Sequence, residues 1–237
     1  MPAVTTQRAY ARFAGAMYLT VLALDISGLV IGSAVSGSGS FADASQRILA
    51  SETLYRIAIC LSLGGSLATV MLAVGLYVTV RPADPNLAVM ALVFRVAEAA
   101  IGGVGIALAF SVLQIRLATG RNNAFDVNQL GALADLFSHG DPNTHVGAIF
   151  FCFGSTIFFY VFLKSGYIPR LLSVWGVFSS ALYAAAWVFG LIVPEGPVAV
   201  VAVASVPILI AEVSTGLWLL IAGINVGETQ AGYAVAT

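Results

Sequence analysis

Six apolar stretches, each about as long as a membrane is thick, constrain what this chain can fold into. A transmembrane helix needs about 20 consecutive apolar residues. Hydrophobic residues make up 59% of the chain and charged residues only 9%, whereas soluble proteins carry about 25% charged residues. We therefore predict an all-α, polytopic transmembrane helix bundle that forms a single integral-membrane domain over residues 1–237. The six predicted spans cover residues 13–34, 54–80, 87–113, 145–163, 171–193 and 198–223.

Two connections between the spans are long enough to hold a helix of their own. A glycine- and serine-rich segment at 36–40 ends the first span, and residues 41–49 then form a short amphipathic stretch. Residues 125–137 place apolar side chains at helical spacing. We predict an interfacial helix in each of these outer loops. Ser51 and Glu52 resemble a helix N-terminus, with a capping hydroxyl and an acid in the first turn.

The distribution of positive residues predicts the orientation of the spans. Cytoplasmic loops carry an excess of Lys and Arg. With the N-terminus inside, the short inner segments hold Arg8, Arg12, Arg81, Lys164 and Arg170, and the acids lean toward the longer outer loops. We expect a multi-pass protein of the cell (inner) membrane with both termini in the cytoplasm. The bias is moderate and also permits the inverted topology.

Charged side chains inside three of the spans are the main candidates for a functional site. Arg95 and Glu98 lie three residues apart in the third span, so a helix places them on one face, where they can pair. Asp25 lies in the first span and Glu212 in the sixth. At about 1.5 Å of rise per residue, all three acids lie roughly 17–18 Å from the inner ends of their helices. This depth is near the midplane of a ~30 Å hydrocarbon core, so we predict one charged layer.

Ionisable groups at such a depth are costly to insert and therefore indicate a substrate, ion or proton site. The alternative is that these charges only hold the bundle together, although polar contacts between membrane helices contribute only about 0.6 kcal/mol each on average. A low dielectric and neighbouring like charges favour the neutral carboxyl group, so we expect at least one acid to carry a proton. Because Arg95 pairs most directly with Glu98, the proton carrier would be Asp25 or Glu212, and we favour Glu212.

A second group of candidates lies nearer the outer face. Glu52 and Arg56 are spaced for an i,i+4 pair at the start of the second span, and His145 opens the fourth span at about the same level. They are interpreted either as helix-end and interfacial residues or as a gate above the charged layer. His139, Asp141 and His145 have the side chains of metal ligands, but their irregular spacing around a proline turn argues against a metal site. We expect no metal and no cofactor.

Several short motifs along the chain carry a resemblance to a known family. They occur in the same order over nearly the whole chain, at residues 11–18, 50–56, 94–99, 164–170 and 212–218. This ordered set resembles the bacterial multi-pass membrane family catalogued as domain of unknown function 4386 (DUF4386). The resemblance implies a multi-pass architecture and supplies no chemistry. Arg95, Glu98 and Glu212 fall inside these motifs, whereas Asp25 does not.

Three functions remain open at this point. The first is binding or transport of a small lipophilic or cationic molecule, or of a proton, by the acids of the charged layer. The second is an intramembrane enzyme that uses a protonated and an ionised carboxyl group on a lipid or isoprenoid-like substrate. The third is a non-catalytic sensor or partner subunit. The expected partners are the lipid bilayer and a small lipophilic ligand. Six spans without an inverted repeat permit a homo-oligomer, and the net charge of −1 gives no reason to expect nucleic acid.

Overall fold

Eight helices make up the computed structural model of the chain, which describes residues 2–119, 125–138, 142–193 and 198–226. Six of them are long and apolar enough to cross a membrane. These are α1 (Pro2–Ser36), α3 (Glu52–Val80), α4 (Pro85–Ala118), α6 (Pro142–Ser165), α7 (Arg170–Ile192) and α8 (Val198–Ile221). The two shorter helices are α2 (Phe41–Ala50) and α5 (Val127–Ser138). The predicted fold class, with six spans and a short helix in each of two loops, is confirmed.

The helices end where the sequence supplies a residue that stops them. Gly37 follows α1 with a φ of 61°, and Gly166 follows α6 with a φ of 66°, a left-handed conformation that favours glycine at a helix C-terminus. Ser40 caps α2 in a reciprocal pair with Asp43. Asp84 caps α4 by accepting a hydrogen bond from the Leu87 amide at 3.1 Å, with a proline at the first helical position.

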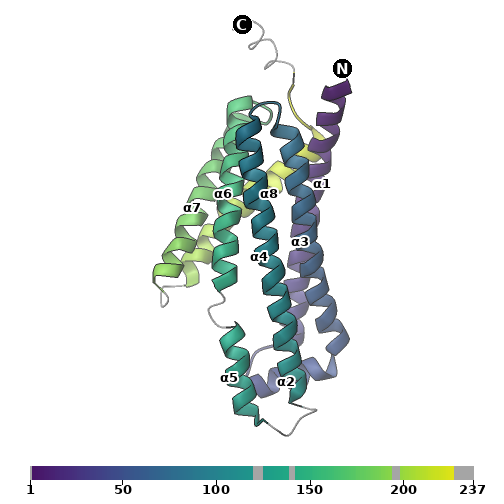
Figure 1. Cartoon of the computed structure of the whole chain (residues 1–237), viewed down its shortest axis with the longest axis vertical. Coiled ribbons are helices and arrows are strands. Elements are labelled where there is room, and N and C mark those ends of the chain that lie inside the picture. The colour runs from purple at the N-terminus through teal and green to yellow at the C-terminus, as the bar shows by residue number, and fades with distance from the viewer. Residues whose placement is uncertain (1, 120–124, 139–141, 194–197, 227–237) are drawn as a thin grey trace, which may run out of the picture.

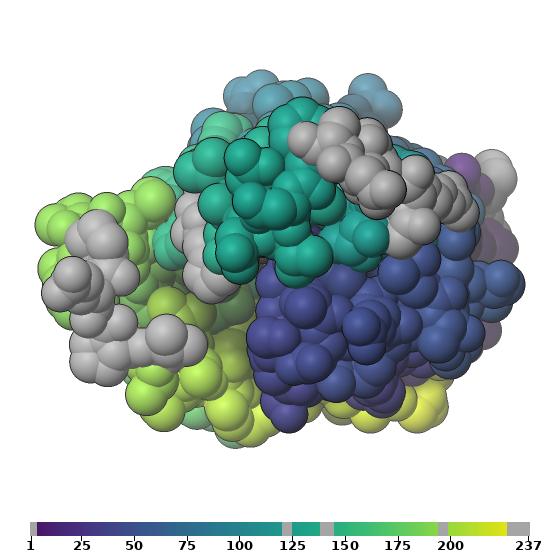
Figure 2. Space-filling view, turned by 90° about the horizontal axis from the view of Figure 1, so that it is seen from below, coloured from purple at the N-terminus to yellow at the C-terminus, as the bar shows by residue number. Residues whose placement is uncertain are grey.

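The six long helices form a closed ring. Around it, α1 packs on α3, α3 on α4, α4 on α6, α6 on α7, α7 on α8, and α8 returns to α1. The start of α1, the end of α8 and the turns after α3 and α6 lie at one end of the molecule, while α2 and α5 lie at the other (Figure 1). We call these the terminal end and the loop end. Seen from the loop end, α2 and α5 lie side by side across the face (Figure 2).

The two ends of the ring differ in how tightly they pack. The main core fills the terminal end, where Phe158, Phe159 and Phe162 of α6 are almost fully buried. At this end α1 and α8 meet at Gly15 and Gly216, and a methyl group on Gly15 would overlap the backbone of α8. From this crossing the two helices diverge toward the loop end (Figure 1). A smaller core of residues from α1 to α4 lies near the loop end.

Three details of the helices go beyond the sequence prediction. The helix that contains the first predicted span begins well before residue 13, since α1 is helical from Pro2. The third predicted span ends at residue 113, whereas α4 continues through Ala118 and includes Arg116. The Arg116 guanidinium lies 4.8 Å from the ring centroid of Phe41, so it joins α4 to α2. Ser51 occupies the N-cap position of α3, but its side chain makes no capping hydrogen bond.

Candidate functional site

A cavity of about 850 Å³ opens inside the ring between α1, α3, α4 and the first turns of α6. Its walls run from Ser36, the last residue of α1, to Asp25 and Glu98. Along α1 this distance is roughly 16 Å. The cavity therefore connects the loop end of the bundle with two of the predicted site residues.

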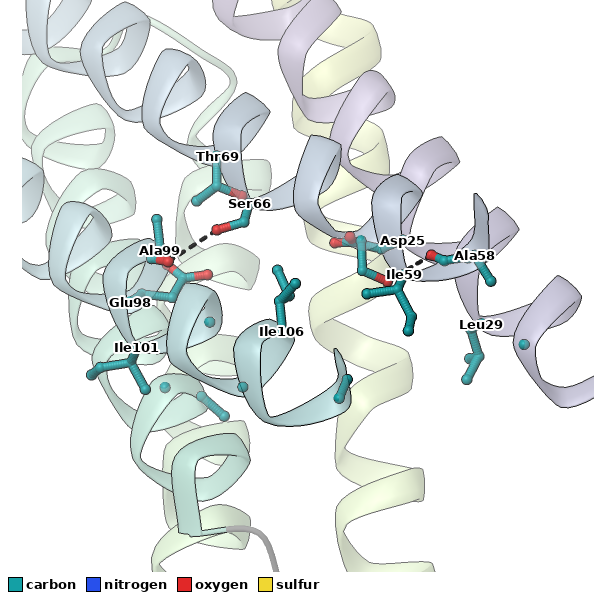
Figure 3. A pocket seen from close by; sticks show the side chains of 18 of the residues that line it. Asp25, Leu29, Ala58, Ile59, Ser66, Thr69, Glu98, Ala99, Ile101 and Ile106 are labelled. Atoms are coloured by element: carbon teal, nitrogen blue, oxygen red, sulfur yellow. Dashed lines mark hydrogen bonds between the residues drawn. The ribbon is translucent and has the colours of Figure 1, made fainter. Parts of the chain in front are cut away.

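Glycines line this cavity on three of its four helices. They are Gly28 of α1, Gly102 of α4 and Gly147 of α6. Apolar side chains share the wall with hydroxyl groups, so the surface is amphiphilic. One of these hydroxyls, on Ser66 of α3, donates a hydrogen bond of 2.9 Å to the backbone carbonyl of Ala99 in α4 (Figure 3). This bond ties two walls of the cavity together beside the acids.

Asp25 and Glu98 approach the cavity from opposite walls, α1 and α4 (Figure 3). Asp25 is an exposed residue. Its carboxylate lies directly against Gly65 of α3, where a methyl group would overlap it. The side chain of Glu98 is 20% exposed. Both carboxylates are thus within reach of a molecule that occupies the cavity.

Arg95 lies behind Glu98 and is closed off from the cavity. Its side chain is only 3% exposed, and its Nη1 atom lies 3.0 Å from Oε2 of Glu98. The same nitrogen donates a long hydrogen bond of 3.4 Å to the Ser155 hydroxyl of α6. The guanidinium also lies 4.7 Å from the ring centroid of Phe151, a cation–π arrangement. The α6 partners fix Arg95 in place, which in turn orients Glu98.

Glu212 completes this cluster from α8 but does not line the cavity. It interacts electrostatically with Arg95 and Asp25. Its Oε1 atom is buried and has no hydrogen-bond partner in the described residues. Tyr18, on α1, is 3% exposed and interacts electrostatically with Glu212, Arg95 and Glu98. Sequence analysis missed Tyr18, since a tyrosine in an apolar span resembles a core residue unless its neighbours on other helices are known.

The structure thus brings together the four charged residues predicted for the midplane, Asp25, Arg95, Glu98 and Glu212. Electrostatic interactions join all four. Three helices that are not consecutive in the chain, α1, α4 and α8, supply them. We call this group the charged cluster.

The outer-face candidates form two separate features. Arg56 and Glu52 make the predicted ion pair, with 2.7 Å between Nη2 and Oε1. His145 packs edge-on against Trp187 of α7, with ring centroids 4.9 Å apart. Among the described residues no group of three metal-ligating side chains occurs. His139 and Asp141 lie outside the described residues.

A ring of six apolar helices around a charged cluster defines a multi-pass membrane protein with an internal polar site. The family model "Domain of unknown function (DUF4386)" matches residues 13–223. The chain belongs to this family, as its ordered motifs indicated. The searches of curated proteins and of solved structures found no significant match.

Proposed function

We propose that this protein binds a small lipophilic cation in the cavity and carries it, with Asp25 and Glu98 as the carboxylates that recognise the positive charge. The observation that supports this proposal is the cavity of about 850 Å³ whose inner end is formed by these two acids. A charge placed in a membrane core requires a partner of opposite sign. Carboxylates that face an open volume of this size are available to a ligand.

The wall of the cavity favours a ligand that is both cationic and apolar. Leu29, Ile59 and Ile106 supply apolar surface, while Ser62 and Ser66 supply hydroxyl groups. Apolar walls with a few converging polar groups are typical of small-molecule sites. Arg95 disfavours a second cation close behind Glu98, because like charges repel in a medium of low dielectric.

We further propose that the protein resides in the inner membrane of a bacterium with both termini in the cytoplasm. The terminal end carries Arg8, Arg12, Arg81, Lys164 and Arg170, the excess expected of a cytoplasmic face. In this orientation the cavity opens away from the cytoplasm.

Calorimetric titration of the purified protein in detergent with tetraphenylphosphonium, a lipophilic cation of fixed charge, tests the proposed site. We expect binding to the wild type and a loss of about tenfold or more in affinity for Asp25→Asn and for Glu98→Gln, since each removes an attractive charge worth more than about 1.4 kcal/mol. Glu52→Gln is the matched control because Glu52 pairs with Arg56 outside the cavity wall. Equal affinities for all four proteins would contradict the proposal.

The same proteins in liposomes separate carriage from catalysis. A carrier moves tetraphenylphosphonium across the bilayer and releases it chemically unchanged. An acid–base enzyme would instead convert a lipid of the bilayer, which mass spectrometry of the recovered lipids detects. A structural subunit would do neither.

A further inference from the structure

Three buried polar atoms of the charged cluster have no hydrogen-bond partner in the described residues: Nε of Arg95, Oε1 of Glu212 and Oε2 of Glu98. Oε2 of Glu98 has an ion-pair partner, since it lies 3.0 Å from Nη1 of Arg95. The other two atoms are complementary, because Nε of Arg95 is a donor and Oε1 of Glu212 is an acceptor. The two side chains interact electrostatically across α4 and α8. Arg95 meanwhile uses its Nη1 atom for Glu98. The guanidinium therefore has a second carboxyl group nearby to which it is not bonded.

This arrangement indicates the charge state of Glu212. A buried carboxylate is strongly disfavoured unless it is paired and hydrogen-bonded. Since Arg95 is ion-paired with Glu98, the neutral form of Glu212 fits its unbonded oxygen. Asp25 faces the open cavity and Glu98 has its guanidinium partner, so both can stay ionised.

We infer that the protein exchanges a proton for its cation, because Arg95 changes its carboxylate partner from Glu98 to Glu212 when a cation binds. This inference rests on the proposed function, since the cation is the one bound at Asp25 and Glu98. The cation takes up the Glu98 carboxylate, Arg95 bonds to Glu212, and the O–H bond of Glu212 breaks. The proton leaves to the solvent, and the net charge of the cluster together with its bound cation equals that of the empty cluster.

Several other ionisable groups interact with Glu212, and their charges also affect whether it holds its proton. The elements packed around it contribute Tyr18 and Asp25 from α1, Arg95 and Glu98 from α4, Cys152 from α6 and Tyr183 from α7. Of these, Arg95 is the only group that keeps a positive charge at every accessible pH. The exchange therefore depends on which carboxylate Arg95 joins.

Proton counting during cation binding tests the exchange. Tetraphenylphosphonium cannot gain or lose a proton, so any proton released on binding comes from the protein. Calorimetry in two buffers with different heats of ionisation gives the number of protons released per cation bound. We expect about one proton from the wild type near neutral pH, and none from Glu212→Gln, which binds the cation more weakly because Arg95 then loses its second carboxylate.

Tyr183→Phe is the control, because it removes another ionisable group that faces Glu212 and is expected to leave the count at about one. Glu212→Asp keeps a carboxyl group and is expected to release a proton when the cation binds. It is the variant to measure if Glu212→Gln does not fold. Cation binding by the wild type without proton release would overturn the exchange while leaving the proposed function intact. An unchanged count for Glu212→Gln would overturn it as well. Failure of the wild type to bind the cation would overturn both proposals.

Discussion

At the scale of single residues, Arg95 determines the character of the site. It is nearly inaccessible, and it contacts Glu98 of its own helix and both Phe151 and Ser155 of α6. Arginine suits this position because its planar group can hydrogen-bond at its edge and stack on an aromatic face at the same time. A lysine would keep the charge and lose this combination.

Replacing Arg95 with glutamine is expected to destabilise the protein by about 3 kcal/mol, because removing one partner of a buried ion pair leaves the other uncompensated. The measurement is unfolding of the purified protein in mixed micelles of increasing denaturing detergent. The double variant Arg95→Gln with Glu98→Gln is expected to recover part of this loss.

The exposed pair on α3 is the comparison for this experiment. Glu52→Gln breaks an ion pair whose side chains are 28% and 39% exposed, and such pairs contribute roughly 0–1 kcal/mol. If Arg95→Gln is no more harmful than Glu52→Gln, Arg95 does not hold the charged cluster in the way described.

At the scale of helices, the crossing of α1 and α8 closes the ring above the cavity. A Cβ atom on Gly15 would lie 2.6 Å from the carbonyl oxygen of Gly216, and one on Gly216 would lie 2.8 Å from Cβ of Tyr18. Small residues at such a crossing let membrane helices approach closely. The same contact positions Tyr18 and Glu212, which belong to these two helices.

Alanine at Gly15 or Gly216 is therefore expected to destabilise the fold by about 1–3 kcal/mol, because the extra methyl group forces the helices apart. The control is Gly103→Ala in α4, where a Cβ atom would meet nothing within 4 Å. That change is expected to be neutral or to stabilise by about 0.5–1 kcal/mol, since alanine favours helix. Equal thermal midpoints for the three variants would exclude a close crossing.

A second link between elements joins two turns at the terminal end. Lys164 of α6 donates a hydrogen bond of 2.9 Å to Oδ2 of Asp84, which also caps α4. The hydrogen bond from Lys164, followed by the one from the Leu87 amide, lowers the pKa of Asp84. A carboxyl group with a lowered pKa stabilises the folded state at pH values above its ordinary pKa of about 3.9. This contribution is lost as the pH falls through the folded-state value.

We accordingly expect the wild type to have a higher Tm than Asp84→Asn near neutral pH, and the difference to disappear as the pH is lowered below about 4. Thermal unfolding at several pH values measures it. In a Lys164→Met background, Asp84→Asn is expected to lower the Tm at neutral pH by a smaller amount. The reason is that Lys164→Met removes the first cause of the lowered pKa of Asp84. A difference that stays constant down to acidic pH would show that the bridge does not contribute.

At the scale of the whole molecule, much of the architecture could be predicted from the sequence because a membrane requires long apolar helices. The same constraint placed Asp25, Glu98 and Glu212 at one depth, and the structure brings them together. Depth does not reveal which helices are neighbours. The cavity and the α6 partners of Arg95 depend on the order of helices around the ring, which hydropathy does not contain.

The proposed orientation predicts opposite accessibility for the two ends. In a variant without Cys60 and Cys152, a cysteine introduced as Ser38→Cys at the loop end is expected to react with a membrane-impermeant maleimide on intact cells. One introduced as Asn86→Cys at the terminal end is expected to react only after the cells are opened. Both positions are exposed in the structure, so burial does not explain a difference. The reverse pattern would establish the inverted topology.

The closure of the ring by α1 and α8 has a consequence for biosynthesis. Among the six spans, α1 is made before its neighbour α3, and its other neighbour, α8, is made after the remaining five. Until α8 is inserted, α1 carries an open flank and the guanidinium of Arg95 has only one of its two carboxyl neighbours. A chain truncated after α7 would keep five spans and lack a completed site. Assembly of the charged cluster thus has to wait for the insertion of α8, and a nascent chain cannot complete it before then.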